Sequence, residues 1–539
     1  MRPLLAALLA SAALTGCAHN GAAPAGGRRA YTIPHVLRIA TVENVSTLNT
    51  HLSTQAIVSA MSELTAAWLV RTSTRGAPIP ELATAIPTKA NGGISAGGKT
   101  ITYHLRRGVV WSDGAPFNAD DVVFSTKIIL NPANNEGSRA GWDDIARIEE
   151  PDKYTVVYRL RRPYGGFVYQ YFSTASNPSV LPKHLLGNLA NINEAPYNSL
   201  PVGIGPFKYE RWRRSDYIEM VANPRYFRGP PRLARIVFKL VADRNSALSE
   251  LQSHEVDLWA VAPAYYERAR RIPGITVVKQ PGSGFLHIDL NVAHLALADV
   301  NVRRALRLAI DRQTLNHKIG DDLGVVQDDM VSPGNPAFDS RVPTAPFDLA
   351  AANRALDRAG WKRGPDGIRR KGAMRLALLF ATPIGSPDYD QRTELIRGWF
   401  AQIGAELDVK RYTAPQMFAA AQDGGILSGG NFDLATFIYS GDPEGDVSDY
   451  YSCREVPPNG QNVSRYCNQR VDAAMRAFEM LYTFRERRPY EDFIQEQLAR
   501  DVPTIVLDIV PSIFAYNADL RGFHPGSGGA FDNFLNVDI

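Results

Sequence analysis

Runs of apolar and polar residues along the chain predict an α/β protein. Short β-rich runs are separated by helical stretches, and they lie at Val36–Val42, Ile236–Val241, Gly284–Leu290 and Ile505–Ile509. Residues 299–313 have helical periodicity, with one apolar face made of Val300, Ala305, Leu308 and Ala309. A second helix is expected over 348–359, because Asp348 is a good N-cap and Gly360 a good terminator.

Residues 93–100 read GISAGGKT and match the phosphate-binding pattern G-x-x-x-x-G-K-T. A phosphate loop needs a buried strand before it and a helix after it. Here Pro87 interrupts the preceding stretch, and the alternation in 100–106 is that of a half-exposed strand. The overlapping G-x-S-x-G around Ser95 is the esterase pattern, which also requires a helix directly afterwards. We therefore predict a hairpin turn with neither activity.

The first residues have the pattern of a secretory signal. Arg2 is followed by an apolar run that is too short to span a bilayer, and the run ends in LTGC at Cys17. This ending resembles the bacterial lipoprotein box, so we expect 1–17 to be a signal peptide, Cys17 to be lipidated and 18–33 to be a flexible tether. The mature protein would then be periplasmic or at the cell surface, anchored to a membrane and without an ATP supply. The alternative is an ordinary signal peptide with a chance cysteine.

The other two cysteines are Cys453 and Cys467. In an oxidising compartment such a pair is most simply a disulfide. A loop of this size would stabilise the fold by about 3 kcal/mol in the chain-entropy model. Two free buried thiols are the alternative.

Composition bounds the size and the partners of the protein. The chain has 539 residues, of which 45% are hydrophobic and 21% charged, as in ordinary globular proteins with two or three domains. The net charge of +4 is small for this length and gives no support for nucleic-acid binding. Ten scattered histidines without H-E-x-x-H or C-x-x-C predict no metal site, and we expect no cofactor.

Eight segments in order resemble one family, the large solute-binding proteins of bacterial ABC importers in the oligopeptide/dipeptide/nickel class. They cover nearly the whole mature chain, at 98–125, 201–207, 223–229, 254–257, 302–311, 359–361, 432–434 and 466–472. In the first segment we expect a helix that opens at Asn118 or Ala119, with Asp120 and Asp121 in its first turn, at the positive end of the helix dipole.

The resemblance implies a two-lobed periplasmic-binding-protein fold of the large class, with an extra subdomain and a hinge between the lobes. Lobe I would comprise 34–78, 205–285 and 500–539, the subdomain 79–204, and lobe II 286–499. The chain would cross between the lobes at 281–285 and 500–503, where glycines can absorb the dihedral change of closure.

The resemblance also suggests a recognition loop. In peptide-binding relatives an aromatic residue lies three positions before an aspartate that pairs with the α-ammonium of the peptide. Tyr439, Gly441 and Asp442 match this arrangement, although Tyr replaces the usual Trp and Pro443 follows directly. Asp442 would make a charge-assisted hydrogen bond to an ammonium group. The alternative is that Asp442 only initiates a turn.

Other ligand contacts are expected in both lobes. Relatives place an aromatic pocket residue four positions before a proline, which corresponds here to Trp259 and Pro263; a core tryptophan is the alternative. Ser53 and Thr54 follow the first strand and should face the cleft. Asn291 would line the cleft or bond the backbone at the crossing.

The function implied by the resemblance is binding without catalysis. We expect a monomer that captures a small hydrophilic solute, first of all a peptide, and delivers it to a permease in the inner membrane. A nickel chelate, an oligosaccharide or a modified peptide are alternative cargoes. The other classes left open are an exported hydrolase using Ser95 or a carboxylate pair, and a scaffold or chaperone.

Overall fold

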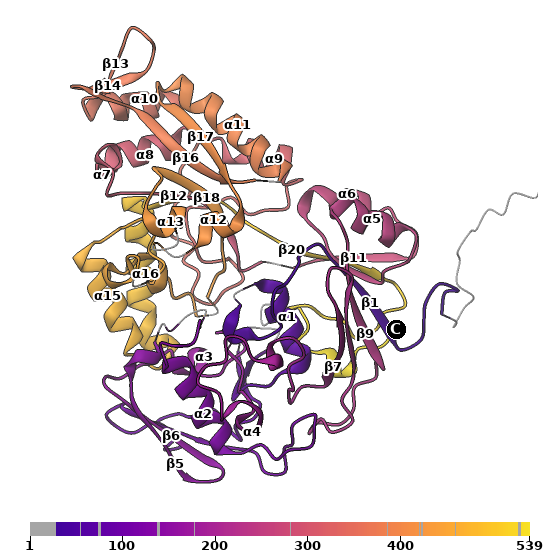
Figure 1. Cartoon of the computed structure of the whole chain (residues 1–539). Coiled ribbons are helices and arrows are strands. Elements are labelled where there is room, and N and C mark those ends of the chain that lie inside the picture. The colour runs from indigo at the N-terminus through magenta and orange to yellow at the C-terminus, as the bar shows by residue number, and fades with distance from the viewer. Residues whose placement is uncertain are drawn as a thin grey trace, which may run out of the picture.

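The computed structural model describes most of the chain downstream of the N-terminal segment. The described residues are 28–53, 55–73, 77–136, 139, 141–176, 178–280, 282–384, 386–419, 421, 424–442, 444–458, 460–526 and 530–539. The signal peptide, Cys17 and Thr54 therefore lie outside them. Within these residues the fold is mixed α/β, with sheets of seven, five and three strands as its main layers (Figure 1).

The seven-stranded sheet forms the part that we call lobe I, at the right of Figure 1. β1 (Val36–Thr41) lies near its centre and pairs in parallel with β9 (Arg235–Leu240) and β10 (Leu258–Ala260). The inward side chains of β1, such as Leu37 and Ile39, are almost fully buried, as the apolar run predicts. In spatial order the strands are β11 (Ile275–Gln280), β20 (Ser512–Asn517), β10 (Leu258–Ala260), β1 (Val36–Thr41), β9 (Arg235–Leu240), β8 (Tyr217–Ala222) and β7 (Phe207–Arg213).

The five-stranded sheet forms lobe II, at the top of Figure 1. Its order is β17 (Glu406–Tyr412), β16 (Ala377–Pro383), β18 (Leu434–Tyr439), β12 (Phe285–Leu290) and β19 (Thr504–Ile509). Every residue of β12 and β19 is buried, which fits apolar strands that are covered on both faces.

The position of β19 corrects one expectation. Residues 500–503 were expected to carry the chain back into lobe I, but α16 (Phe484–Asp501) ends there and β19 then pairs with β12. The chain leaves lobe II at 510–511, between β19 and β20. The expected boundary at residue 500 therefore falls about ten residues too early, because β19 completes the lobe II sheet before the crossing.

One of the two three-stranded sheets of the described residues belongs to the expected subdomain, and the GISAGGKT segment leads into its strand β4. β4 (Thr100–His104) pairs with β6 (Thr155–Leu160), which also pairs with β5 (Ile145–Asp152). Gly98 has φ +71°, and the Thr100 backbone N–H donates to Ser95 Oγ at 3.0 Å. A strand follows the loop instead of a helix, so the prediction of a hairpin turn is confirmed.

Helix ends follow their capping signals. α2 (Ala119–Leu130) opens at Asn118 with a capping box in which Asp121 is the partner, as expected. α10 (Leu349–Arg358) is capped by Asp348, and Gly360 has φ +86° after its end.

The helix expected over 299–313 is two helices. α8 (Val300–Leu308) and α9 (Arg312–Ile319) are separated by a short break, and Asp311 caps the second. The buried positions of α8 include Val302, Ala305 and Leu306, so its inner face differs from the one expected.

The subdomain touches lobe II at the connection between α15 (Gln469–Glu479) and α16. Tyr482 donates its hydroxyl to the Gly98 carbonyl at 2.7 Å. The Gly165 N–H donates to the Glu479 carbonyl at 2.6 Å, and Arg162 pairs with the Glu479 carboxylate at 2.8 Å. The hairpin with the sequence pattern of a phosphate loop therefore takes part in the contact between the subdomain and lobe II.

Candidate ligand-binding site

A cavity of about 430 Å³ lies where the chain crosses between the two larger sheets. Its walls come from residues within 280–285, 330–336, 441–450 and 524–526. The first segment is a crossing, the next two belong to lobe II, and the last follows β20 of lobe I. The size is that of a small-molecule or short-peptide site, and both lobes contribute to it.

Asp442 reaches this cavity and also organises its own loop. One carboxylate oxygen, Oδ1, accepts from the Glu444 N–H at 2.7 Å and from the Asp446 N–H at 3.2 Å. This is a turn of the kind that Asp commonly initiates. The turn fixes the carboxylate at the cavity wall, so shaping the turn and facing a ligand are compatible roles.

The carboxyl of Asp442 is easily protonated in this surrounding. Desolvation by the enclosing protein, and then the charges of Glu444 and Asp446, raise the pKa of Asp442 to about 8. The side chain is half-buried, so some contact with the cavity remains. A cation placed beside it would favour the ionised form and lower this pKa.

Tyr439 lies under the wall of the cavity. It is 8% exposed, and its hydroxyl donates to the Gln461 carbonyl at 3.2 Å. Its ring is stacked between His287 at 4.5 Å and Tyr450 at 3.9 Å. Tyr450 lines the cavity, as does Phe285, whereas Tyr439 does not line it and supports the ring of Tyr450 from behind.

Gly441 lies against the crossing between lobes. A β-carbon at Gly441 would be 2.3 Å from the Ser283 carbonyl oxygen. On the other side of this segment, a β-carbon at Gly282 would be 1.7 Å from the Val510 carbonyl oxygen. The recognition loop and both crossings are thus in direct backbone contact, which only glycine permits at these positions.

The remaining expected contacts do not line this cavity. Trp259 is 3% exposed and packs edge-to-face on Tyr265 in a core cluster of lobe I, which corresponds to the core alternative. Ser53 is buried, and its hydroxyl accepts from the Gln55 N–H at 3.2 Å. Asn291 donates to the carbonyls of Gly430 and Phe432. It therefore bonds the backbone within lobe II.

The cavity residues that were not anticipated include Asn335, Asp446, Tyr450 and His524. Asp446 and Tyr450 follow Asp442 so closely that the charge and aromatic pattern of 442–450 could have indicated them. Asn335, which donates to the Asp442 carbonyl at 2.9 Å, and His524 come from distant segments. Their position depends on the tertiary fold, and no local signal marks them.

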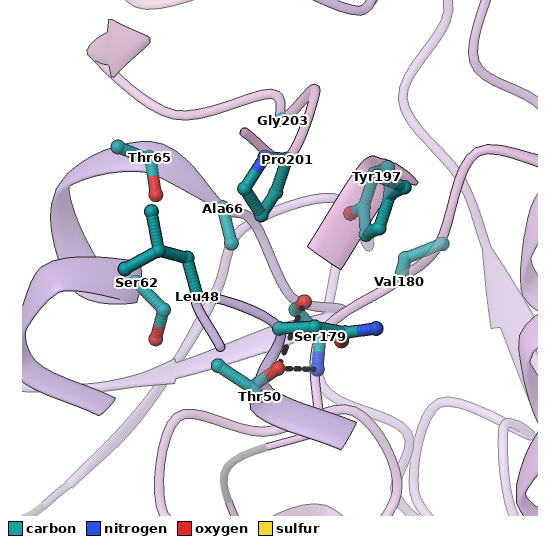
Figure 2. Close-up of a pocket in the computed structure, with 11 residues that line it drawn as sticks. Leu48, Thr50, Ser62, Thr65, Ala66, Ser179, Val180, Tyr197, Pro201 and Gly203 are labelled. Carbon is teal, nitrogen blue, oxygen red and sulfur yellow. Dashed lines mark hydrogen bonds between the residues drawn. The ribbon is translucent and has the colours of Figure 1, made fainter. Parts of the chain in front are cut away.

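A second, much smaller pocket lies between residues 48–66 of lobe I and residues 179–203 of the expected subdomain (Figure 2). Its volume is about 10 Å³, enough for a single water molecule at most. Figure 2 shows Thr50 and Ser179 hydrogen-bonded at its floor, with Tyr197 and Pro201 at its side. It is a packing gap and too small for a solute.

Two further expectations concern cysteines and metals. The structure joins Cys453 and Cys467 by a disulfide, with the Cα atoms 4.7 Å apart. Among the described residues, no group of three or more His, Cys, Asp or Glu side chains has the arrangement of a metal site.

Comparison with known proteins identifies the family. The family model of bacterial extracellular solute-binding proteins, family 5 (middle region), matches residues 77–460, which is well over half of the chain. The chain belongs to this family. The family consists of solute-binding proteins and not of enzymes, and its members bind outside the cytoplasm.

The solute-binding protein has relatives that cover most of its length. It is 26% identical to the oligopeptide-binding protein AppA of Bacillus subtilis, over 80% of this chain and 79% of the relative. It is 25% identical to the dipeptide-binding protein of Escherichia coli, over 76% and 74% of the two chains.

Solved structures have the same two-lobed fold. AppA of B. subtilis, in complex with a nonapeptide, superposes with a TM-score of 0.82 at 23% identity, covering 93% of this chain and 98% of that one. NikZ of Campylobacter jejuni, in complex with Ni(L-His), gives 0.80 at 23% identity, with 94% and 99% covered. None of the helices within the described part of the solute-binding protein has the length and apolar character needed to cross a bilayer.

Proposed function

We propose that this solute-binding protein captures peptides through their free amino end and hands them to the permease of an ABC importer. The observation that carries the proposal is the carboxylate of Asp442 at the wall of a cavity of about 430 Å³ bordered by both lobes. Relatives that bind oligopeptides and dipeptides support the same class of cargo.

The chemistry of the Asp442 loop suits an ammonium group. A carboxylate with a raised pKa lacks a compensating cation, and a ligand ammonium would supply one. The ring of Tyr450 adds an aromatic surface beside it. A charge-assisted hydrogen bond of this kind contributes about 1.5–3 kcal/mol.

A peptide pair tests the proposal directly. Trialanine and N-acetyl-trialanine differ at the amino end, where the acetylated peptide has no positive charge. We expect trialanine to bind the purified protein and the acetylated peptide to bind about tenfold to a hundredfold more weakly. Asp442→Asn should abolish this difference, whereas Asp408→Asn, an exposed carboxylate on β17, should preserve it. Equal affinity for the two peptides would refute recognition of the amino end.

Thermal unfolding with other solutes distinguishes peptide capture from the alternative cargoes. If the protein ignores peptides but its melting temperature rises with Ni(L-His) or with oligosaccharides, peptide capture is wrong and the fold serves another solute. A ligand at about a hundredfold excess over its Kd should stabilise the folded state by about 2.7 kcal/mol.

We also propose a lipid anchor on Cys17, which places the binding lobes at a membrane within reach of the permease. Several acyl chains on one residue would hold the protein stably, where a single chain is marginal. We expect Cys17→Ala to move the protein from the membrane fraction to the soluble fraction. Equal membrane association of the variant would contradict the anchor.

A further inference from the structure

The cavity wall carries more carboxyl groups than one ammonium group requires. Asp442 and Asp446 both line the cavity, and no lysine or arginine is among the described residues that line it. Asp446 accepts a hydrogen bond from the Ser448 N–H at 2.8 Å. No described lysine or arginine forms an ion pair with either carboxylate.

Two arginines of α16 that lie close to the acidic residues around this loop are already paired. Arg487 of α16 pairs with Glu444, and Arg488 pairs with Asp492 at 2.7 Å. Neither arginine therefore forms an ion pair with Asp442 or Asp446.

A buried carboxyl group close to Asp446 extends this acidic cluster. Glu491 of α16 is 3% exposed, and neither of its carboxylate oxygens has a hydrogen-bond partner among the described residues. Burial is the main cause that raises the pKa of Glu491, to about 7. The charges of Arg488 and Arg487 lower this pKa, and those of Asp492 and Asp446 raise it.

We propose that the site selects solutes with at least two positive charges, namely peptides with a free amino end and a lysine or arginine side chain, and that Asp446 reads the second charge. The inference rests on the proposed function and narrows it. A second cation next to Asp446 relieves the repulsion among the loop carboxylates, whereas a neutral side chain leaves it in place. A ligand carboxylate, in contrast, finds no lysine or arginine among the described lining residues.

Two amidated peptides isolate the second charge. Ala-Lys-Ala-amide and Ala-norleucine-Ala-amide share the free amino end and nearly the same side-chain length, and only the first has a second positive charge. Calorimetric titration of the wild-type protein at constant ionic strength should show the lysine peptide binding about tenfold more tightly. In Asp446→Asn this ratio should fall toward one, while the affinity for the norleucine peptide stays within about twofold.

Asp408→Asn is the matched control, since it removes one exposed carboxylate of lobe II outside the cavity. It should retain the tenfold ratio. Equal binding of the two peptides by the wild-type protein would overturn the inference and leave peptide capture intact. Binding of neither peptide would overturn both. The wild-type comparison decides the matter even if a variant folds poorly.

Discussion

At the scale of the residue, Asp442 determines how the ligand-free site responds to pH. Its folded pKa of about 8 is far above the value of about 3.9 for a free aspartate. Between these values the folded state holds a proton that the unfolded chain has released. The stabilising effect of this proton is therefore complete below about pH 4 and is lost as the pH rises toward about 8.

We therefore expect the melting temperature of the ligand-free protein to fall between about pH 5 and about pH 8, and to fall less in Asp442→Asn. Scanning calorimetry over this range measures both slopes. The pKa of Glu444 is also raised, to about 7, first by burial, so part of the slope should remain in the variant. Identical slopes in the two proteins would show that Asp442 does not titrate in this window.

Gly441 gives a steric prediction at the same scale. Gly441→Ala places a β-carbon 2.3 Å from the Ser283 carbonyl oxygen, so the loop or the crossing has to move. Overpacking of this kind costs about 1–3 kcal/mol, and we expect trialanine to bind about tenfold more weakly. Gly398→Ala in α11 (Pro387–Gln402) is the control, since nothing lies within 4 Å of the added carbon there. An unchanged affinity in Gly441→Ala would mean that the loop tolerates the shift.

At the residue level, the sequence was most informative where the signal is local. The resemblance to peptide-binding relatives indicated the loop of Tyr439, Gly441 and Asp442, and Gly441 and Asp442 line the cavity. The same reasoning could not reach Asn335 or His524, because their position follows from how distant segments pack. It also could not show that Tyr439 lies behind Tyr450, since depth is a property of the assembled core.

At the scale of the element, the β-rich runs predicted four strands to within about one residue, because burial of apolar runs is encoded locally. The split between α8 and α9 was missed, since the apolar pattern continues across the break although Asp311 is a helix N-cap. The sheet to which β19 belongs was also missed. Strand pairing depends on contacts between segments that are distant in the sequence. Pro503 indicated that a helix ends before it, but not to which lobe the following strand belongs.

The disulfide belongs to this scale, because it ties the segment after α14 (Ser448–Tyr451) to the start of α15. The two cysteines are 14 residues apart, and the chain-entropy model gives about 3 kcal/mol for such a loop. We expect the double variant Cys453→Ala/Cys467→Ala to lose about this much free energy of unfolding in urea. A thiol reductant should destabilise the wild-type protein similarly and leave the variant unchanged. A double variant as stable as the wild type would contradict the prediction.

At the scale of the whole molecule, the subdomain and lobe II are in contact at a place outside the cavity wall. The subdomain meets lobe II through Tyr482 on the Gly98 carbonyl and through Glu479 with Arg162 and Gly165. Glu479 is 4% exposed, and Arg454 of lobe II also pairs with it. We expect these contacts to favour the arrangement of the lobes seen here, so that part of the affinity for a ligand comes from them.

Tyr482→Phe removes one hydrogen bond of this contact and leaves the cavity wall untouched. A hydrogen bond contributes about 0.5–1.5 kcal/mol net, so trialanine should bind about twofold to tenfold more weakly to the variant. Small-angle scattering should show a larger radius of gyration for the ligand-free variant, which saturating peptide restores. Tyr490→Phe, at an exposed position of α16, is the matched control and should behave as the wild type. If Tyr482→Phe changes neither the affinity for trialanine nor the radius of gyration, the hydrogen bond of Tyr482 to Gly98 does not stabilise the closed arrangement. The hairpin 93–100 would then have a structural role within the subdomain alone.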